Sequence, residues 1–286
     1  MLNRLVLTSI FLCLASSSPL FAKKKVAFDA TPFAGYRQDN VRWTTQYGDT
    51  LKWKNLEGIG YGVATKTTLR DRYFMNADIG FANFFSGSMN DSNYLAAPMS
   101  GNPANNSMSV NNAFAFRPNL AFGMKIKTLK WLDIMPMIGI DYNRLKVSGK
   151  ANAATALSSL SNTLQFYGPY VGFDSKTKFT RRWSMNAGAA FRYAFYHGSG
   201  NWKFQRNLTN NTMRQAGNGF GIQGQIGLKY LLVPTVSIGG EADVNWNRVK
   251  NGHDTRHYAN NVKNKTNLNN LNWTTLAGRV TLTKSF

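Results

Sequence analysis

Residues 236–247 alternate strictly between apolar and polar side chains. Val236, Ile238, Val244 and Trp246 occupy even positions, whereas the odd positions carry Ser, Gly, Glu, Asp and Asn. Because successive side chains of a strand point to opposite faces, this segment predicts a strand with one apolar and one polar face. In a soluble sheet the apolar face would cover a core. In a membrane barrel it faces lipid, and the polar face lines a wet lumen.

The same alternation recurs in ten segments along the chain. They cover about 26–36, 55–66, 73–85, 112–127, 131–144, 163–176, 183–196, 217–232, 236–247 and 272–286. Short turns alternate with long polar connections, which we expect at about 37–54, 86–111, 145–162, 197–216 and 249–270. Each segment is long enough for a tilted membrane strand, which needs about 9–11 residues in lipid.

Aromatic residues gather near the ends of these segments, at the level where lipid headgroups favour amphipathic rings. An even number of strands closes a sheet and leaves no unpaired edge in lipid. The sequence therefore predicts an all-β fold, a ten-stranded antiparallel transmembrane β-barrel with short periplasmic turns and five long extracellular loops. A soluble sandwich or barrel would also alternate, but it does not predict the alternating connections or the aromatic girdles.

The start of the chain is typical of a signal peptide over residues 1–22. Arg4 supplies a positive charge, residues 5–15 are apolar, and a small-residue stretch leads to a cleavage site after Ala22. The apolar run is too short to cross a membrane as a helix. The single cysteine, Cys13, lies inside this segment, so the expected mature barrel, residues 23–286, has no thiol chemistry.

Charge is strongly unbalanced, with 34 Lys and Arg against 13 Asp and Glu and a formal net charge of +21. Such an excess attracts polyanions. The chain carries no recognisable nucleic-acid module, so we expect no nucleic acid and instead outer-membrane lipid, above all lipopolysaccharide, as the partner. Solvated loop charges are the alternative interpretation. The candidates for lipid phosphates are Arg181, Arg182, Lys203, Arg206 and Arg248.

A second group of charged residues shares the parity of the polar face, and we expect it to line the lumen. Its members are Asp78, Asp133, Asp141, Arg192, Lys229, Glu241 and Asp243. They would form either a paired polar plug in a narrow barrel or a charged channel that favours anions. The sequence offers no metal-ligand spacing, and the glycine-rich stretch 58–62 lies inside a strand rather than before a helix. We therefore expect no metal and no cofactor.

Several stretches resemble the omptins, a family of ten-stranded outer-membrane aspartyl proteases. They are "PYVGFDSKTKF" at 169–179, "WSMNAGAAFRYAF" at 183–195, "GEADVNWNRVKNGHDT" at 240–255 and "NWTTLAGRVTLTKSF" at 272–286. The stretch "SGSMNDSNY" at 86–94 is similar to the omptin loop that carries the first catalytic pair. The chain is also similar to the omptin-like porins of environmental chlamydiae, which have comparable basic, Asn-rich loops.

The resemblance implies a catalytic set that this chain does not match. Omptin chemistry uses two aspartates, two residues apart, that hold a water, and an Asp-x-His element opposite them that removes its proton. Here Asp91 occupies one aspartate position and Asn93 the other, and an amide cannot carry the charge. Trp202 and Phe204 stand at the positions of the Asp-x-His element.

Other residues could replace the missing base if the gaps in the resemblance are placed differently. These are His197, His253 and Asp254, for which surface-loop positions are the alternative interpretation. The sequence thus predicts a non-catalytic porin-like or surface barrel in the outer membrane of a Gram-negative type cell. The alternative is an omptin-type aspartyl endopeptidase. The terminal Phe286 is typical of the closing strand that the barrel-assembly machinery reads, and small solutes would be partners if the barrel is a pore.

Overall fold

The computed structural model describes residues 26–92, 105–129, 131–151, 157–204, 211–258 and 262–286. The strands are β1 (Val26–Thr45), β2 (Thr50–Leu69), β3 (Tyr73–Ser92), β4 (Asn105–Met124), β5 (Ile126–Leu129), β6 (Leu132–Ala151), β7 (Leu157–Lys178), β8 (Trp183–Phe204), β9 (Asn211–Val233), β10 (Val236–His257) and β11 (Lys263–Ser285). No helix long and apolar enough to cross a membrane occurs in these ranges.

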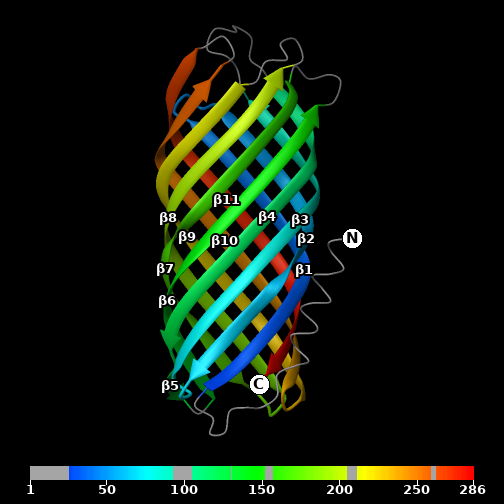
Figure 1. Ribbon diagram of the computed structural model, residues 1–286, viewed down its shortest axis with the longest axis vertical. Coiled ribbons are helices and arrows are strands. Elements are labelled where there is room, and N and C mark those ends of the chain that lie inside the picture. The colour runs from blue at the N-terminus through cyan, green and yellow to red at the C-terminus, as the bar shows by residue number, and fades with distance from the viewer. Residues whose placement is uncertain (1–25, 93–104, 130, 152–156, 205–210, 259–261) are drawn as a thin grey trace.

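The strands form one closed antiparallel sheet (Figure 1). Consecutive strands pair with each other, except that β4 pairs with β6 instead of with the short β5, and β1 pairs with β11. The short β5 follows β4 after a single residue, Lys125, and pairs with the same β6, so the two are one interrupted strand and the barrel has ten. Closure leaves no row of unpaired backbone groups, as a membrane barrel requires. The predicted all-β ten-stranded barrel is confirmed.

The strands are longer than the sequence predicts, because residues assigned to long loops continue the sheet. Residues 37–45 belong to β1 and 50–54 to β2, leaving only 46–49 as the turn. Likewise β6 runs to Ala151, and β8 runs to Phe204. The predicted boundaries of these connections were therefore wrong for the described residues. Strands of 20 to 23 residues are about twice as long as the 9–11 residues that a tilted strand needs to cross lipid.

The apolar and polar faces exchange places along each strand, and this explains the extra length. In β6 the outward side chains include Ile138, Ile140 and Tyr142, followed by the basic Arg144 and Lys146. In the same strand the inward side chains change from polar to apolar, from Asp141 and Asn143 to Leu145 and Val147. A segment with polar side chains outside and apolar side chains inside resembles a strand of a soluble β-protein, whose apolar face covers a core.

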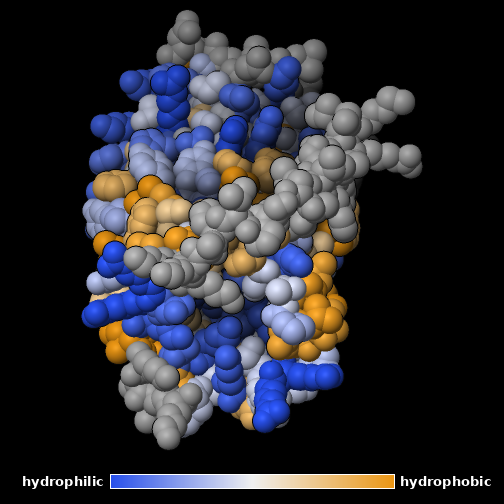
Figure 2. All heavy atoms as spheres, turned by 60° about the horizontal axis from the view of Figure 1, so that its bottom comes forward, coloured by the Kyte–Doolittle hydropathy of each residue, from blue (hydrophilic) through white to orange (hydrophobic). Residues whose placement is uncertain are grey.

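The outside of the barrel accordingly carries an apolar belt bordered by hydrophilic surfaces (Figure 2). Its members include Ile59, Ile79, Phe122, Ile138, Val171, Phe191, Ile226, Val244, Leu276 and Val280, which are 44–65% exposed. Aromatic residues border the belt at both ends. Tyr73, Trp131, Trp183 and Phe286 lie toward the short turns, and Tyr36, Tyr142, Tyr167 and Trp246 lie toward the other end. Exposed apolar area on this scale, in a belt with aromatic borders, is typical of the outer surface of membrane β-barrels.

Candidate functional site

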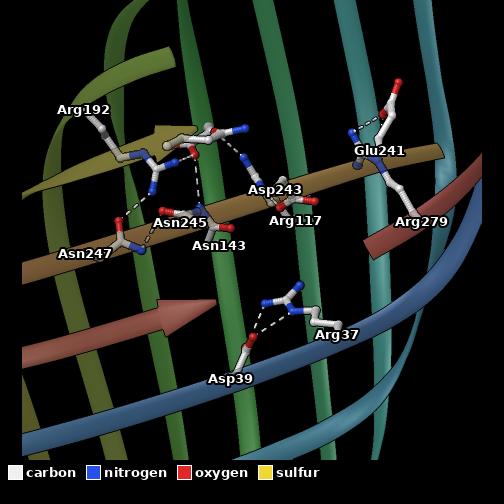
Figure 3. Close-up of polar contacts among 12 residues, drawn as sticks. Arg37, Asp39, Arg117, Asn143, Arg192, Glu241, Asp243, Asn245, Asn247 and Arg279 are labelled. Carbon is white, nitrogen blue, oxygen red and sulfur yellow. Dashed lines mark hydrogen bonds and ion pairs between the residues drawn. The ribbon is translucent and has the colours of Figure 1, made fainter. Parts of the chain in front are cut away.

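The inside of the barrel has three levels, which are a polar cavity at the short-turn end, a network of charged and amide side chains in the middle, and an apolar plug at the other end. Figure 3 shows polar contacts of the network. Arg192 of β8 forms an ion pair with Asp141 of β6 and donates a hydrogen bond to Oδ1 of Asn247 at 2.8 Å. Asn143 donates to Asp141 at 3.1 Å, and Asn247 donates to Asn245 at 3.3 Å. These partners come from β6, β8 and β10, so the network joins walls that face each other across the bore.

A second ion-pair group lies nearer to the short turns. Glu241 of β10 accepts from Arg279 of β11 at 2.9–3.0 Å and pairs with Lys229 of β9 at 3.3 Å. Arg117 of β4 donates to Gln223, and its guanidinium is 4.0 Å from the Asp243 carboxylate. Each charge has an opposite charge nearby, which offsets the cost of removing it from bulk water.

The structure places all seven predicted lumen residues on the inner face. Asp78, Lys229, Glu241 and Asp243 line a cavity of about 250 Å³ at the short-turn end. Asp141 and Arg192 are buried above it, and Asp133 pairs with Lys125 at 2.7 Å. The cavity admits water from that mouth, and the network of Arg192 and Asp141 lies at its inner end.

Above the network an apolar plug fills the bore. Its largest members are Trp43, Trp53, Trp202, Trp273, Tyr196 and Phe166, each at most 1% exposed. Two of its indole nitrogens donate hydrogen bonds inside it, that of Trp43 to Gln215 at 2.9 Å and that of Trp273 to Asp39 at 3.1 Å. The Tyr196 hydroxyl also donates to Gln215, at 2.6 Å. Side chains at such low exposure leave no water-filled passage between them.

The described residues of the implied catalytic set lie near the ends of two strands, β3 and β8. Asp91 is buried on the inner face near the end of β3, opposite Leu51 of β2. Asn93 lies outside the described residues. Trp202 is a plug residue whose ring meets that of Tyr258 edge to face at 5.9 Å, and Phe204 ends β8. The two positions of the Asp-x-His element therefore belong to the end of an extended strand, not to a loop.

All three histidines lie on the outside of the barrel. His197 stacks on the outward ring of Tyr167, with the ring planes 8° apart, while His253 and His257 are exposed on β10. Asp254, next to His253 in sequence, points inward and is bound by Arg256 at 2.8–2.9 Å. Consequently no imidazole faces Asp91 from across the bore.

The predicted lipid-phosphate residues do not form one site. Arg181 and Arg182 lie in the turn between β7 and β8, at the short-turn end. Lys203 lies at the opposite end of β8, about 70 Å away along the strand. Arg248 follows Trp246 of the aromatic border by two residues on the outer face, and Arg206 lies outside the described residues. Of the four members that the structure describes, Arg248 alone is next to the belt on the side away from the short turns.

A separation of charge between the two faces was missed by reasoning from sequence. Ten of the 13 acidic residues point into the barrel, namely Asp29, Asp39, Asp78, Asp91, Asp133, Asp141, Asp174, Glu241, Asp243 and Asp254. The outer wall beyond the belt carries Arg42, Lys52, Lys54, Arg144, Lys146, Lys150, Lys203, Arg214, Arg248, Lys250, Lys263 and Lys265, with Glu57 as its one acidic residue in the described ranges. Partial burial and then the neighbouring Arg42 and Lys54 lower the pKa of Lys52. The outer wall beyond the belt is thus strongly positive, and parity along the extended strands could have shown it.

A closed antiparallel barrel with an apolar outer belt, two aromatic borders and a polar bore is the architecture of outer-membrane β-barrels. The family model described as Protochlamydia outer membrane protein (Pom) matches residues 33–286, and the chain belongs to this family. No curated protein matches the chain.

Among solved structures, the outer membrane protease OmpT from Escherichia coli has the same fold, with a TM-score of 0.72 and 13% identity. The alignment covers 94% of this chain and 100% of that one. The translocator domain of the autotransporter NalP from Neisseria meningitidis gives 10% identity and a TM-score of 0.38, covering 99% of this chain and 96% of that one. The outer membrane protein OprG from Pseudomonas aeruginosa gives 8% identity and a TM-score of 0.37, and the alignment covers 92% of this chain and 97% of that one. The likeness to OmpT concerns the fold and carries no activity with it.

Proposed function

We propose that this protein is a non-catalytic surface barrel of the outer membrane, with its short turns in the periplasm and its plugged end outside the cell. The observation that carries the proposal is the position of the histidines. A water held by Asp91 would need a general base within hydrogen-bond reach, and all three imidazoles are on the other side of the barrel wall. The signal peptide over residues 1–22 is part of the proposal.

The test of the non-catalytic part is a peptidase assay. We expect the refolded protein, mixed with lipopolysaccharide and a fluorogenic dibasic peptide, to release no more product than the Asp91→Ala variant. Cleavage that the wild type supports and Asp91→Ala abolishes would favour the alternative, an omptin-type aspartyl endopeptidase.

The plug supports a barrel that does not conduct in its resting state. Steady ion flow needs a continuous aqueous path, and the side chains of Trp43, Trp53 and Trp273 close the bore beyond the polar network. We expect the protein, inserted into a planar lipid bilayer, to give no steady current at moderate voltage. Uniform open-channel steps in every insertion would contradict this.

Porin-like activity is the second candidate, and the cavity favours it. Its polar lining, which includes Lys66, Asp174 and Lys176, opens to the short-turn mouth and resembles one half of a channel. Small solutes would then cross only after the plug moves. Uptake of small sugars by liposomes that contain the protein, without steady current, would support this gated form.

Outer-leaflet lipid, with lipopolysaccharide as the main species, is the partner that we propose for the belt. Arg144 and Arg248 follow the aromatic border residues Tyr142 and Trp246 by two positions on the same face. Guanidinium groups at that level suit lipid phosphates. The C-terminal Phe286, whose ring lies 5.9 Å from that of Phe28 at the closing seam, is the feature that we assign to the assembly machinery.

The position of the belt gives a graded prediction. Ile138 lies on the outer face of β6, between the border residues Trp131 and Tyr142, and is 65% exposed. We expect Ile138→Arg to lower the free energy of unfolding in lipid vesicles by about 2–4 kcal/mol, because the charge enters the hydrocarbon. The control Ser199→Arg, on the outer wall beyond the belt, should cost about 0–1 kcal/mol. Equal costs, measured by guanidinium unfolding, would contradict this membrane position.

A further inference from the structure

The outer wall of β6, β7 and β8 beyond the belt presents cations and hydroxyl groups in matching rows. Lys150, Ser159 and Lys203 are paired across the three strands in one row. In the adjacent row on the same face, Ser148 pairs with Ser161, and Ser161 pairs with Asn201. The sheet register therefore gathers residues from distant parts of the sequence into one facet, which we call the lysine–serine facet.

The facet is hollowed. A groove of about 250 Å³ lies over these residues, because serine side chains form the floor between two long lysine side chains. The Ser148 and Ser161 hydroxyls are 3.2 Å apart and bond to each other. Neither Lys150 nor Lys203 forms an ion pair with an acidic residue in the described ranges. The groove thus offers two lysines without an acidic partner in the described ranges, at the two ends of a three-strand row, whose backbone positions are about 10 Å apart.

The position of the facet excludes lipid phosphates as its occupant. Ser148 follows the border residue Tyr142 by six residues, which is about 20 Å along the strand. With a strand tilt of about 40°, the groove lies roughly 15 Å beyond the aromatic border. Lipid phosphates lie near that border, beside Arg144. A ligand of the facet must therefore come from outside the bilayer.

We propose that the lysine–serine facet binds an acidic saccharide chain on the cell exterior. Ring hydroxyls are both donors and acceptors, as are the hydroxyls of Ser148 and Ser161 and the amide of Asn201. Sulfate, phosphate or carboxylate groups on neighbouring sugars would meet Lys150 and Lys203 as charge-assisted hydrogen bonds. A nucleic acid or an acidic peptide would supply the charge but few hydroxyls for the floor. The inference goes beyond the proposed function and rests on it for the position of the belt in the membrane.

The test measures binding of a fluorescent heparin-derived octasaccharide to the full barrel in an uncharged detergent at about 0.15 M salt, where distant surface charges are screened. We expect saturable binding, and no binding of the neutral maltooctaose. The double variant Lys150→Gln/Lys203→Gln should weaken binding by about tenfold or more, the usual effect of losing charged hydrogen bonds. The matched control Arg42→Gln/Lys54→Gln removes two outer-wall cations from β1 and β2, on the far side of the barrel, and should change binding less than twofold.

A third variant separates a built groove from simple charge attraction. Ser159→Leu/Ser161→Leu keeps every charge but fills the floor, and we expect it to weaken octasaccharide binding about tenfold while the gel mobility of the folded barrel stays normal. Unchanged binding in this variant, or equal losses in the facet variant and the Arg42→Gln/Lys54→Gln control, would overturn the proposal in favour of unspecific attraction. Loss of lipid A vesicle binding in the Ser159→Leu/Ser161→Leu variant would also overturn it, since lipid phosphate would then be the ligand. None of these outcomes changes the tests for conduction or cleavage.

Discussion

Replacing Asp141 by alanine should lower the free energy of unfolding by about 3–5 kcal/mol, the usual cost of leaving a buried charge without its partner. Arg192 is 3% exposed, and its guanidinium pairs with Asp141 and donates to the Asn247 amide oxygen. Without the carboxylate, one positive charge remains inside a barrel wall that lipid surrounds. Guanidinium unfolding in lipid vesicles, followed by the gel mobility of folded and unfolded forms, measures the change.

The double variant Asp141→Leu/Arg192→Met is the matched control for this prediction. It removes both charges and fills similar volume with apolar side chains, which in buried ion pairs is often neutral or stabilising. We expect it to recover most of the stability that Asp141→Ala loses. If the double variant is as unstable as the single one, the pair contributes through its shape and hydrogen bonds, and the unpaired charge is not the cause.

The lipid-facing half of the barrel could be predicted from sequence because one physical rule governs it. Hydrocarbon demands apolar side chains at every second position, so segments such as 131–144 and 183–196 alternate clearly. The inward parity of Asp141, Glu241 and Asp243 is a consequence of the same rule. Strand number, closure and the seven lumen positions therefore needed no information beyond the local pattern.

The half outside the belt escaped prediction because the rule reverses there. Residues 37–45 still alternate, but Val41 and Trp43 now point inward, while Arg42 and Thr44 meet water. Composition alone makes such a segment look like a polar loop. A search that accepts apolar side chains on either the outer or the inner face would have predicted the full length of these strands.

Bulges add a second difficulty. Trp53 and Leu56 of β2 both point inward although they are three residues apart. A β-bulge at Asn55, where φ is 50°, inserts one extra residue into β2 relative to β3 and shifts the register. Each bulge inverts the parity of the residues after it, so counting from the strand start gives the wrong face. The same register shifts set which distant side chains meet across the bore, as Trp43 meets Gln215. Such pairings depend on the closed barrel and have no local signal.

Trp43→Ala should lower the free energy of unfolding by about 3–5 kcal/mol, because it removes a fully buried indole from the plug. It also removes the donor that Gln215 accepts from at 2.9 Å. Trp43→Phe is the matched variant, since it keeps most of the buried area and loses the indole N–H. There the Tyr196 hydroxyl still donates to the Gln215 amide oxygen at 2.6 Å, so we expect a cost of only about 1–2 kcal/mol. A third substitution, Tyr47→Ala at a 71% exposed turn position, should change stability by less than about 0.5 kcal/mol.

The order of these three costs distinguishes a packed core from a mobile obstruction. If the plug is packed as a soluble protein interior, truncation must exceed the conservative change by about 2 kcal/mol, because cavity formation adds to the lost contacts. If the side chains instead move aside easily to open the bore, alanine and phenylalanine should cost nearly the same, and the alanine variant should pass current in a planar bilayer. Guanidinium unfolding and conductance on the same preparations therefore decide together whether the outer half of this barrel is a closed wall or a gate.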